Sequence, residues 1–240
     1  MQSTNLLDFI TTAHGGLEKW NKWSQIEVTL IIRGNLLAYK GISPFKRKMK
    51  VTINSKSVKA ILDPFPKDGF IGVYEGDFVF IQNKETGEVI SELQNARNSC
   101  KSKLLWNHLN LLYFLGYAFW NYVNTPYLFY WEDFKVNELK ETKIGNSYSH
   151  TLEVIFPDSV PSHCQKQIFY FSEKGLLQRL DYTAEIFGNF LVGAHICENH
   201  KQFNGFFFPT HRIVYPRLHK TPLPFLPSAM EGWIENIAFK

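Results

Sequence analysis

The stretch from residue 104 to residue 131 contains no Asp, Glu, Lys or Arg, and no other feature of this sequence constrains the fold as strongly. A membrane-spanning helix needs about 20 predominantly apolar residues. Here four asparagines and His108 interrupt the stretch, and the longest run without strongly polar side chains is residues 111–120. We therefore expect a helix buried by protein on most sides, with no stable membrane insertion. Its candidates for lining a cavity are His108, Tyr113, Tyr117 and Trp120.

Alternation of apolar and polar residues predicts strands on both sides of this helix. Glu75-Gly76 and Asn204-Gly205 each separate two alternating runs, as in a hairpin. The predicted strands are 26–34, 46–54, 57–62, 70–82 and 83–93 in the first half, and 150–157, 166–173, 176–187, 190–203, 206–217 and 230–239 in the second.

Two antiparallel meanders that flank one apolar helix predict a mainly β fold with N-terminal helices. We expect a strongly bent antiparallel half-barrel wrapped around the hydrophobic helix. The alternative is a sandwich of two sheets. A sandwich has no interior place for a long uncharged helix, so the half-barrel is favoured.

The segment HGGLEKW, residues 14–20, predicts a joint between two helices. Apolar residues at helical spacing precede it, and glycine weakens a helix interior by roughly 1 kcal/mol relative to alanine. The first helix is therefore expected to end near His14, and a second short one to follow from Leu17 to Trp23. Whether His14 reaches a cavity stays open at this point.

The length and composition of the chain favour one domain, residues 1–240, and argue against several classes of protein. The net charge of +4 comes from scattered Lys and Arg, which gives no basic groove for nucleic acid. Three widely spaced cysteines argue against a disulfide framework and a zinc site. With no visible secretory signal, we expect a cytoplasmic protein. No nucleotide-binding or metalloenzyme motif occurs, so no cofactor and no metal are predicted.

Two pairs of polar residues in the second half are candidates for chemistry. His163 and Gln167 lie at an expected barrel rim, where they either orient a ligand's carbonyl or hydroxyl group or satisfy loop carbonyls. Arg179 and Asp181 share one face of a strand. Asp181 is then either an acid–base carboxylate with a pKa set by Arg179, or half of an ordinary ion pair on the outer wall.

The last strands carry further histidines. His195 and His200 are five residues apart on one strand and should point to opposite faces, which argues against a shared metal ion. In residues 209–217 one set of side chains faces inward and the other outward, and the sequence does not show which. The two sets are His211, Ile213, Tyr215 and Arg217, and Arg212, Val214 and Pro216.

Several motifs together resemble a group of bacterial proteins related to the LolA-like fold. They are HGGLEKW (14–20), GYAFWNY (116–122), FP (156–157), GLLQRLDY (175–182), PTHR (209–212) and VYPR (214–217). The resemblance implies a half-closed antiparallel barrel with an apolar concave side covered by helices. In lipoprotein carriers that side binds acyl chains, and in the enzyme VioE it shapes an indole intermediate.

The sequence and the resemblance together predict a protein that encloses a hydrophobic small molecule, as a monomer or a homodimer. The alternative is a cofactor-independent enzyme of specialised metabolism, of the cyclase, isomerase or lyase type. For that alternative the catalytic candidates are His163, Asp181, His195 and His211. The ligand-binding candidates are Arg179, Gln167 and Tyr215, together with His108, Tyr113, Tyr117 and Trp120 of the predicted helix.

Overall fold

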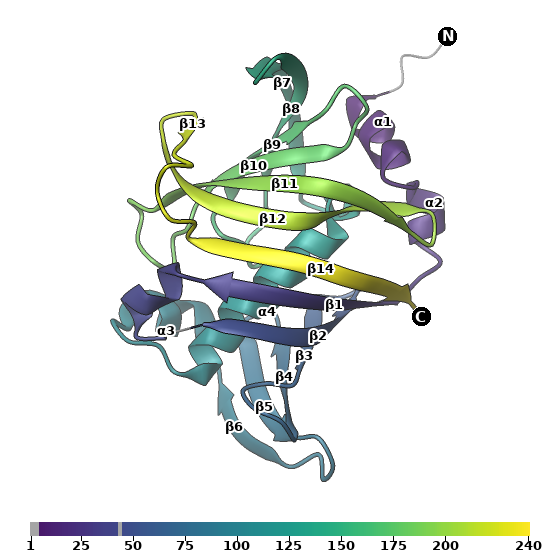
Figure 1. Ribbon diagram of the computed structural model, residues 1–240. Helices are drawn as coiled ribbons and strands as arrows, with labels where there is room; N and C mark the ends of the chain where they lie inside the picture. The colour runs from purple at the N-terminus through teal and green to yellow at the C-terminus, as the bar shows by residue number, and fades with distance from the viewer. Residues whose placement is uncertain (1–4, 43–44) are drawn as a thin grey trace.

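A computed structural model describes residues 5–42 and 45–240 of the chain. It contains one large antiparallel sheet and a few helices (Figure 1). The strands are β1 (Gln25–Gly34), β2 (Lys46–Asn54), β3 (Lys59–Asp63), β4 (Phe70–Glu75), β5 (Phe78–Asn83), β6 (Val89–Leu93), β7 (Lys135–Ile144), β8 (Ser147–Ile155), β9 (Lys166–Phe171), β10 (Leu177–Thr183), β11 (Val192–Phe203), β12 (Phe206–Leu218), β13 (Thr221–Pro222) and β14 (Met230–Phe239). The helices are α1 (Leu6–Ala13), α2 (Leu17–Trp20), α3 (Ala96–Ser102) and α4 (His108–Asn124), with 3-10 turns η1 (Leu36–Lys40) and η2 (Tyr127–Tyr130).

The strand order is β6-β5-β4-β3-β2-β1-β14-β12-β11-β10-β9-β8-β7, with the short β13 paired to β12. The last strand, β14, joins the two meanders, because it pairs with β1 on one side and with β12 on the other. The sheet stays open, with β6 and β7 at its ends, and it bends around α4 (Figure 1). The bent, open sheet confirms the predicted half-barrel.

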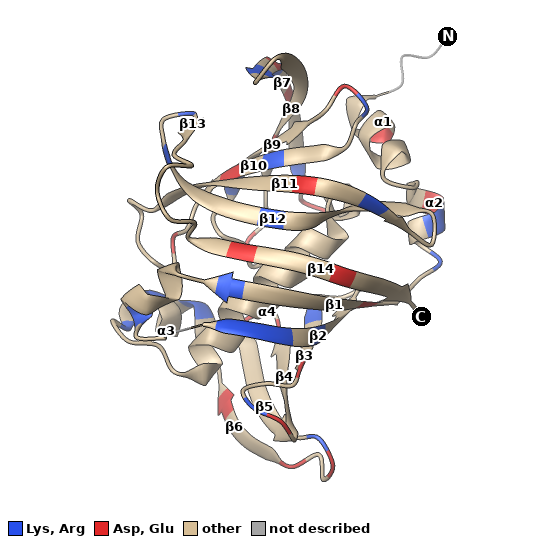
Figure 2. Ribbon diagram, in the orientation of Figure 1, with Lys and Arg blue, Asp and Glu red and all other residues tan. Residues whose placement is uncertain are grey.

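Helix α4 lies against the concave face of the sheet, behind the central strands in the view of Figure 1. From Leu109 to Asn124 its side chains are buried, except that Tyr122 is half-buried. Figure 2 shows the helix free of charged residues, as the sequence requires. In the described part of the chain no helix is long and apolar enough to cross a membrane. The prediction of a helix buried by protein is confirmed.

Tight packing fixes α4 against the first meander. A Cβ at Gly116 would lie 2.5 Å from Tyr74 Cβ, and one at Gly72 would lie 2.6 Å from a methyl group of Leu112. At the N-terminus the side chains of Asn107 and Asn110 bond each other's backbone N–H groups, a reciprocal cap. The helix is therefore held at its start and along the face toward β3 and β4.

The HGG segment forms the predicted joint between α1 and α2. Gly15 and Gly16 have φ angles of 125° and 93°, which other residues rarely adopt. His14 is buried, donates from Nδ1 to the Ile10 carbonyl at 2.9 Å, and accepts at Nε2 from the Leu177 amide at 3.4 Å. Both ring nitrogens are thus occupied by backbone groups, which answers the open question: His14 fastens α1 to the sheet.

Candidate functional site

A cavity of about 70 Å³ lies between α4 and the concave face of the sheet. Most of its lining is apolar, as expected where an uncharged helix faces the inner side of half-buried strands. Helix α4 contributes Phe114, Leu115, Ala118, Phe119, Tyr122 and Val123. The sheet contributes Val28, Leu30, Ile32, Val51, Tyr182, His195, Phe208, Arg212, Val214 and residues 230–234 of β14.

Gly232 opens one wall of this cavity. It pairs with Ile32 on one side and Arg212 on the other, so a side chain at 232 would point to the same face as theirs. A Cβ at this position would have only the Ile31 carbonyl within 4 Å, at 3.8 Å. The space over β14 therefore exists because residue 232 has no side chain.

Arg212 reaches this cavity from the concave face of β12, whereas the other charged lining residue, Glu231, pairs with Arg33 and His211 of the convex face. The Arg212 guanidinium lies 5.0 Å from the centroid of the Tyr122 ring. Its Nη1 donates to Cys197 Sγ at 3.2 Å and its Nη2 to the Tyr122 carbonyl at 3.4 Å. Among the residues that the structure describes, no carboxylate pairs with it. A half-buried cation without an anion is an unusual arrangement in a protein interior.

His195 lies on the same face, beside Arg212 and the same tyrosine. Its ring packs edge-on against Tyr122, with centroids 4.7 Å apart. The side chain is 2% exposed, and neither ring nitrogen has a hydrogen-bond partner in the described part of the protein. Burial, reinforced by the Arg212 charge, holds the pKa of His195 well below its usual value, so the imidazole is neutral. Its one donor and one acceptor are therefore both unused within the described part of the protein.

His163 connects the other polar side chains of the concave side. Its Nδ1 lies 3.0 Å from the Tyr117 hydroxyl and its Nε2 lies 2.6 Å from the Tyr122 hydroxyl. The ring also stacks on Tyr182 at 4.0 Å. Burial lowers the pKa of His163 to about 3. His163 is therefore a neutral bridge between two tyrosines of α4.

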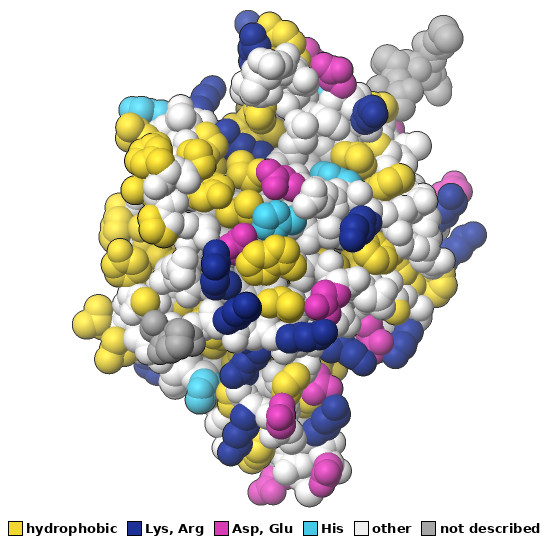
Figure 3. All heavy atoms as spheres, viewed as in Figure 1, with side chains coloured by type: hydrophobic (Ala, Val, Ile, Leu, Met, Phe, Trp, Pro, Cys, Tyr) yellow, Lys and Arg dark blue, Asp and Glu magenta, His cyan; other side chains and the backbone are white. Residues whose placement is uncertain are grey.

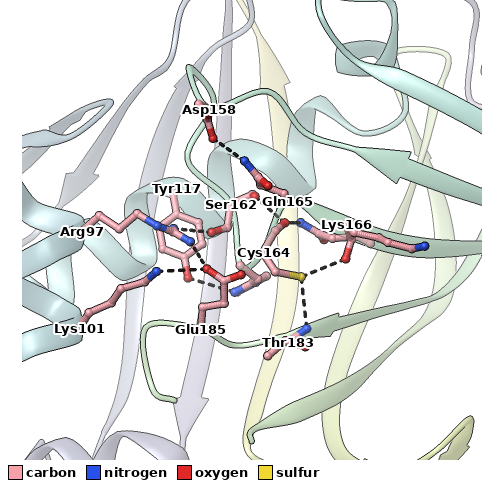
Figure 4. Close-up of polar contacts among 12 residues, drawn as sticks. Arg97, Lys101, Tyr117, Asp158, Ser162, Cys164, Gln165, Lys166, Thr183 and Glu185 are labelled. Atoms are coloured by element: carbon pink, nitrogen blue, oxygen red, sulfur yellow. Dashed lines mark hydrogen bonds and ion pairs between the residues drawn. The ribbon is translucent and has the colours of Figure 1, made fainter. Parts of the chain in front are cut away.

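The loop that carries His163 is held from the side of α3, as Figure 4 shows. Arg97 donates to the Ser162 carbonyl at 2.7 Å and to the Glu185 carboxylate at 2.8 Å. Gln167, a predicted ligand-binding residue, is buried and donates to the Cys164 carbonyl at 3.1 Å. Of its two predicted roles, Gln167 therefore performs the one that satisfies a loop carbonyl.

Arg179 and Asp181 lie on the opposite, convex face of the sheet. Their neighbours Leu180 and Tyr182 face the core, and side chains alternate along a strand. The pair is bidentate, with Nε–Oδ1 at 2.6 Å and Nη2–Oδ2 at 2.7 Å, and Arg179 also donates to the Lys220 carbonyl beside β13. The sheet separates this pair from His163 and His195, so Asp181 and Arg179 do not share their site.

His211 and Tyr215 also face the convex side, because Arg212 and Val214 between them face the cavity. His211 lies 3.1 Å from Glu231 and 3.4 Å from Glu198, and it stacks on Trp233. Figure 3 shows this face, where charged side chains of both signs lie among hydrophobic ones. Arg212 and Val214 of the second set therefore line the cavity, whereas His211 and Tyr215, a predicted catalytic and a predicted ligand-binding residue, lie outside it.

The four residues of α4 that were predicted to bind the ligand have different positions in the structure. His108 is the first residue of α4 and is exposed, so it does not line the cavity. Trp120 donates to the carbonyls of Asn54 and Ser57, which fixes the β2–β3 turn. Tyr113 lies in a second pocket beside Arg97. Tyr117 does not line the cavity and is linked to the lining residue Tyr122 through His163. Phe119 and Tyr122 of α4 do line the cavity. The sequence did not single them out, because α4 has no charged residue to mark which of its sides faces outward.

Asn199 separates His195 from His200 and has a φ of 54°, so the regular alternation of β11 stops there. His200 is half-buried. Across residues 5–42 and 45–240, no group of three or more His, Cys, Asp or Glu side chains is arranged to hold a metal ion.

Solved structures with the same architecture exist at low sequence identity. An outer membrane lipoprotein-sorting protein domain from Vibrio parahaemolyticus superposes with a TM-score of 0.55 at 16% identity, over 95% of this chain and 93% of that one. A LolA superfamily protein from Nitrosomonas europaea gives 0.54 at 13%, over 96% and 92%. A DUF1329 family protein from Desulfovibrio piger gives 0.59 at 12%, over 98% and 92%. No protein-family model and no curated protein matches the sequence. The chain thus has the LolA-like fold.

Proposed function

We propose that the protein binds a hydrophobic small molecule between α4 and the concave face of the sheet. The observation that carries this proposal is the apolar cavity that remains where an uncharged helix meets the central strands. The similarity in fold to an outer membrane lipoprotein-sorting protein domain supports it.

The cavity volume sets a condition on binding. Sites for drug-sized ligands have volumes of roughly 300–1,000 Å³, against about 70 Å³ here. An occupant larger than a few heavy atoms therefore requires side chains of the cavity lining, such as Leu115 and Phe119 of α4, to change position. The opposite side of the helix is packed without space at Gly116 and Tyr74, so the helix backbone is held there and the adjustment is left to the lining side chains.

The enzyme alternative is less well supported. Its four catalytic candidates lie on two faces of the sheet, and His163 and His195 alone share the concave side. Both nitrogens of His163 are occupied by tyrosine hydroxyls, and a pKa of about 3 makes it a weak base near neutral pH. The chemistry available to these two residues favours binding over proton transfer.

Substitution of Gly232 tests the proposal directly. Gly232→Val places a β-branched side chain in the cavity at a strand position that tolerates it sterically. We expect the wild-type protein to bind the neutral fluorescent probe N-phenyl-1-naphthylamine saturably, and Gly232→Val to weaken that binding at least tenfold without lowering the thermal midpoint. The control is Asn236→Val, on the same strand but exposed, which should bind like wild type. Equal binding by Gly232→Val, or no binding by the wild type, would contradict the proposal.

A further inference from the structure

We propose that the hydrophobic ligand carries a single carboxylate, which Arg212 binds with His195 as a second hydrogen-bond donor. This inference rests on the proposed function and specifies the chemistry of the ligand. It depends on the juxtaposition of an arginine without an anion and a buried histidine without hydrogen-bond partners, both on the wall of one cavity.

The donors of Arg212 are incompletely used. A guanidinium has five N–H groups, and here a thiol and a backbone carbonyl are its hydrogen-bond acceptors. Neither acceptor is charged, so the positive charge on the concave side lacks compensation. Partial burial of a cation without an anion is unfavourable, and a bound anion offsets that cost.

His195 supplies a second, independent indication. Cys197 pairs with Arg212 across β11 and β12, and His195 lies two residues before Cys197 on the same face. The Tyr122 ring contacts both side chains, at 4.7 Å from the His195 ring and 5.0 Å from the Arg212 guanidinium. A buried polar side chain without a partner is rare in native proteins. An oxygen between Arg212 and His195 would give the imidazole N–H an acceptor.

The surroundings favour a carboxylate among the anions. One guanidinium matches one carboxylate in charge and in bidentate geometry, whereas a phosphate carries more charge than a single arginine compensates. The other arginines of this region, Arg179 and Arg217, are on the convex side with Asp181. The rest of the cavity lining is predominantly apolar. The geometry therefore fits an apolar acid, either a fatty acid or an aromatic monocarboxylic acid.

Displacement of N-phenyl-1-naphthylamine by decanoate and by decanol tests this inference, because the two compounds share an apolar chain and differ in the charged group. We expect decanoate to bind the wild-type protein at least tenfold more tightly than decanol. Arg212→Met should remove that preference while leaving the affinity for the neutral probe within about twofold. Arg33→Met, which removes an arginine from the convex face, should keep the preference.

The results separate this inference from the proposed function. Equal binding of decanoate and decanol by the wild type, or a preference retained in Arg212→Met, would overturn the carboxylate site and leave hydrophobic binding intact. Failure of both compounds to displace the probe would overturn it as well. Loss of probe binding in Gly232→Val, by contrast, reports on the proposed function alone. The wild-type comparison needs no variant, so poor folding of Arg212→Met would not prevent a decision.

Discussion

Two arginines on the two faces of one sheet differ in how their charge is compensated. Arg179, on the convex face, is 6% exposed, and the Asp181 carboxylate binds it at two points. Arg212, on the concave face, is half-buried and has a thiol, a carbonyl and an aromatic ring as neighbours. A charge buried for stability is normally paired within the protein. The difference indicates that Arg179 serves the fold and that Arg212 is available to a ligand.

The environment of Asp181 shows how completely the convex pair is integrated. The Tyr170 hydroxyl donates to Oδ2 at 3.2 Å, and Arg217 Nε lies 3.9 Å from the same atom. The chain around β13 covers the pair, because Lys220 gives its carbonyl to Arg179. Both charged side chains of this pair are bound by oppositely charged or polar groups of the protein, whereas Arg212 has no carboxylate partner among the described residues.

Asp181→Asn should have the largest effect of the changes that test this comparison. Loss of the carboxylate leaves Arg179 buried and uncompensated, so we expect the free energy of unfolding to fall by about 3–5 kcal/mol. Urea denaturation followed by tryptophan fluorescence measures it. Asp63→Asn is the matched control, because Asp63 pairs with Lys84 at the surface, and such pairs contribute about 0–1 kcal/mol. A loss below 1 kcal/mol for Asp181→Asn would remove the structural role assigned to the pair.

The concave side should instead be sensitive to acid through His163. Its pKa is about 3 in the folded protein and about 6.5 when unfolded, so between these values the unfolded chain binds more protons. The contribution of His163 to the free energy of unfolding is therefore fully present above pH 6.5. It is lost as the pH falls, by up to about 1.4 kcal/mol per pH unit. His163→Asn should show a shallower decline from pH 6.5 to pH 5 in urea denaturation. The exposed His108→Asn should keep the wild-type slope; equal slopes for all three proteins would contradict the prediction.

The fold could be predicted from the sequence because its strongest signals are local. A long uncharged stretch predicted the buried helix α4, and alternation with turn residues located most of the strands to within a few residues. The predicted strand 83–93 was too long, because residues 84–88 lie outside any strand. Helix α3 was not predicted, since ARNSCKS has no apolar periodicity. The short strand β13 was also not predicted. The chain around it covers the Arg179–Asp181 pair, which is why this pair is buried although it lies on the outer face of the sheet.

The site was predicted only in part because a strand pattern does not say which of its two faces is inside. Residues 209–217 carry an arginine or a histidine in each set, so composition could not separate Arg212 from His211. The pairing of Arg212 with Cys197 on the preceding strand and with Gly232 on β14 shows which set faces the concave side. The sequence named His163 and His195 as candidates for chemistry without placing them on a face, and their tyrosine and arginine neighbours depend on how α4 packs across the sheet.

Arg212→Met should have the smallest effect on stability, and it tests directly whether Arg212 differs from Arg179. An unpaired cation contributes little to the folded state, and methionine keeps an unbranched apolar stem that can pack against Tyr122. We expect the free energy of unfolding to change by no more than about 1 kcal/mol, with a gain as readily as a loss. The same urea denaturation, in the absence of ligand, measures it beside Asp181→Asn. A loss as large as that of Asp181→Asn would mean that Arg212 is compensated within the protein after all, because only a paired buried charge is so costly to remove. A change near zero would mean that Arg212 does not stabilise the folded protein. Its position on the cavity wall would then be explained by binding the anion of a ligand.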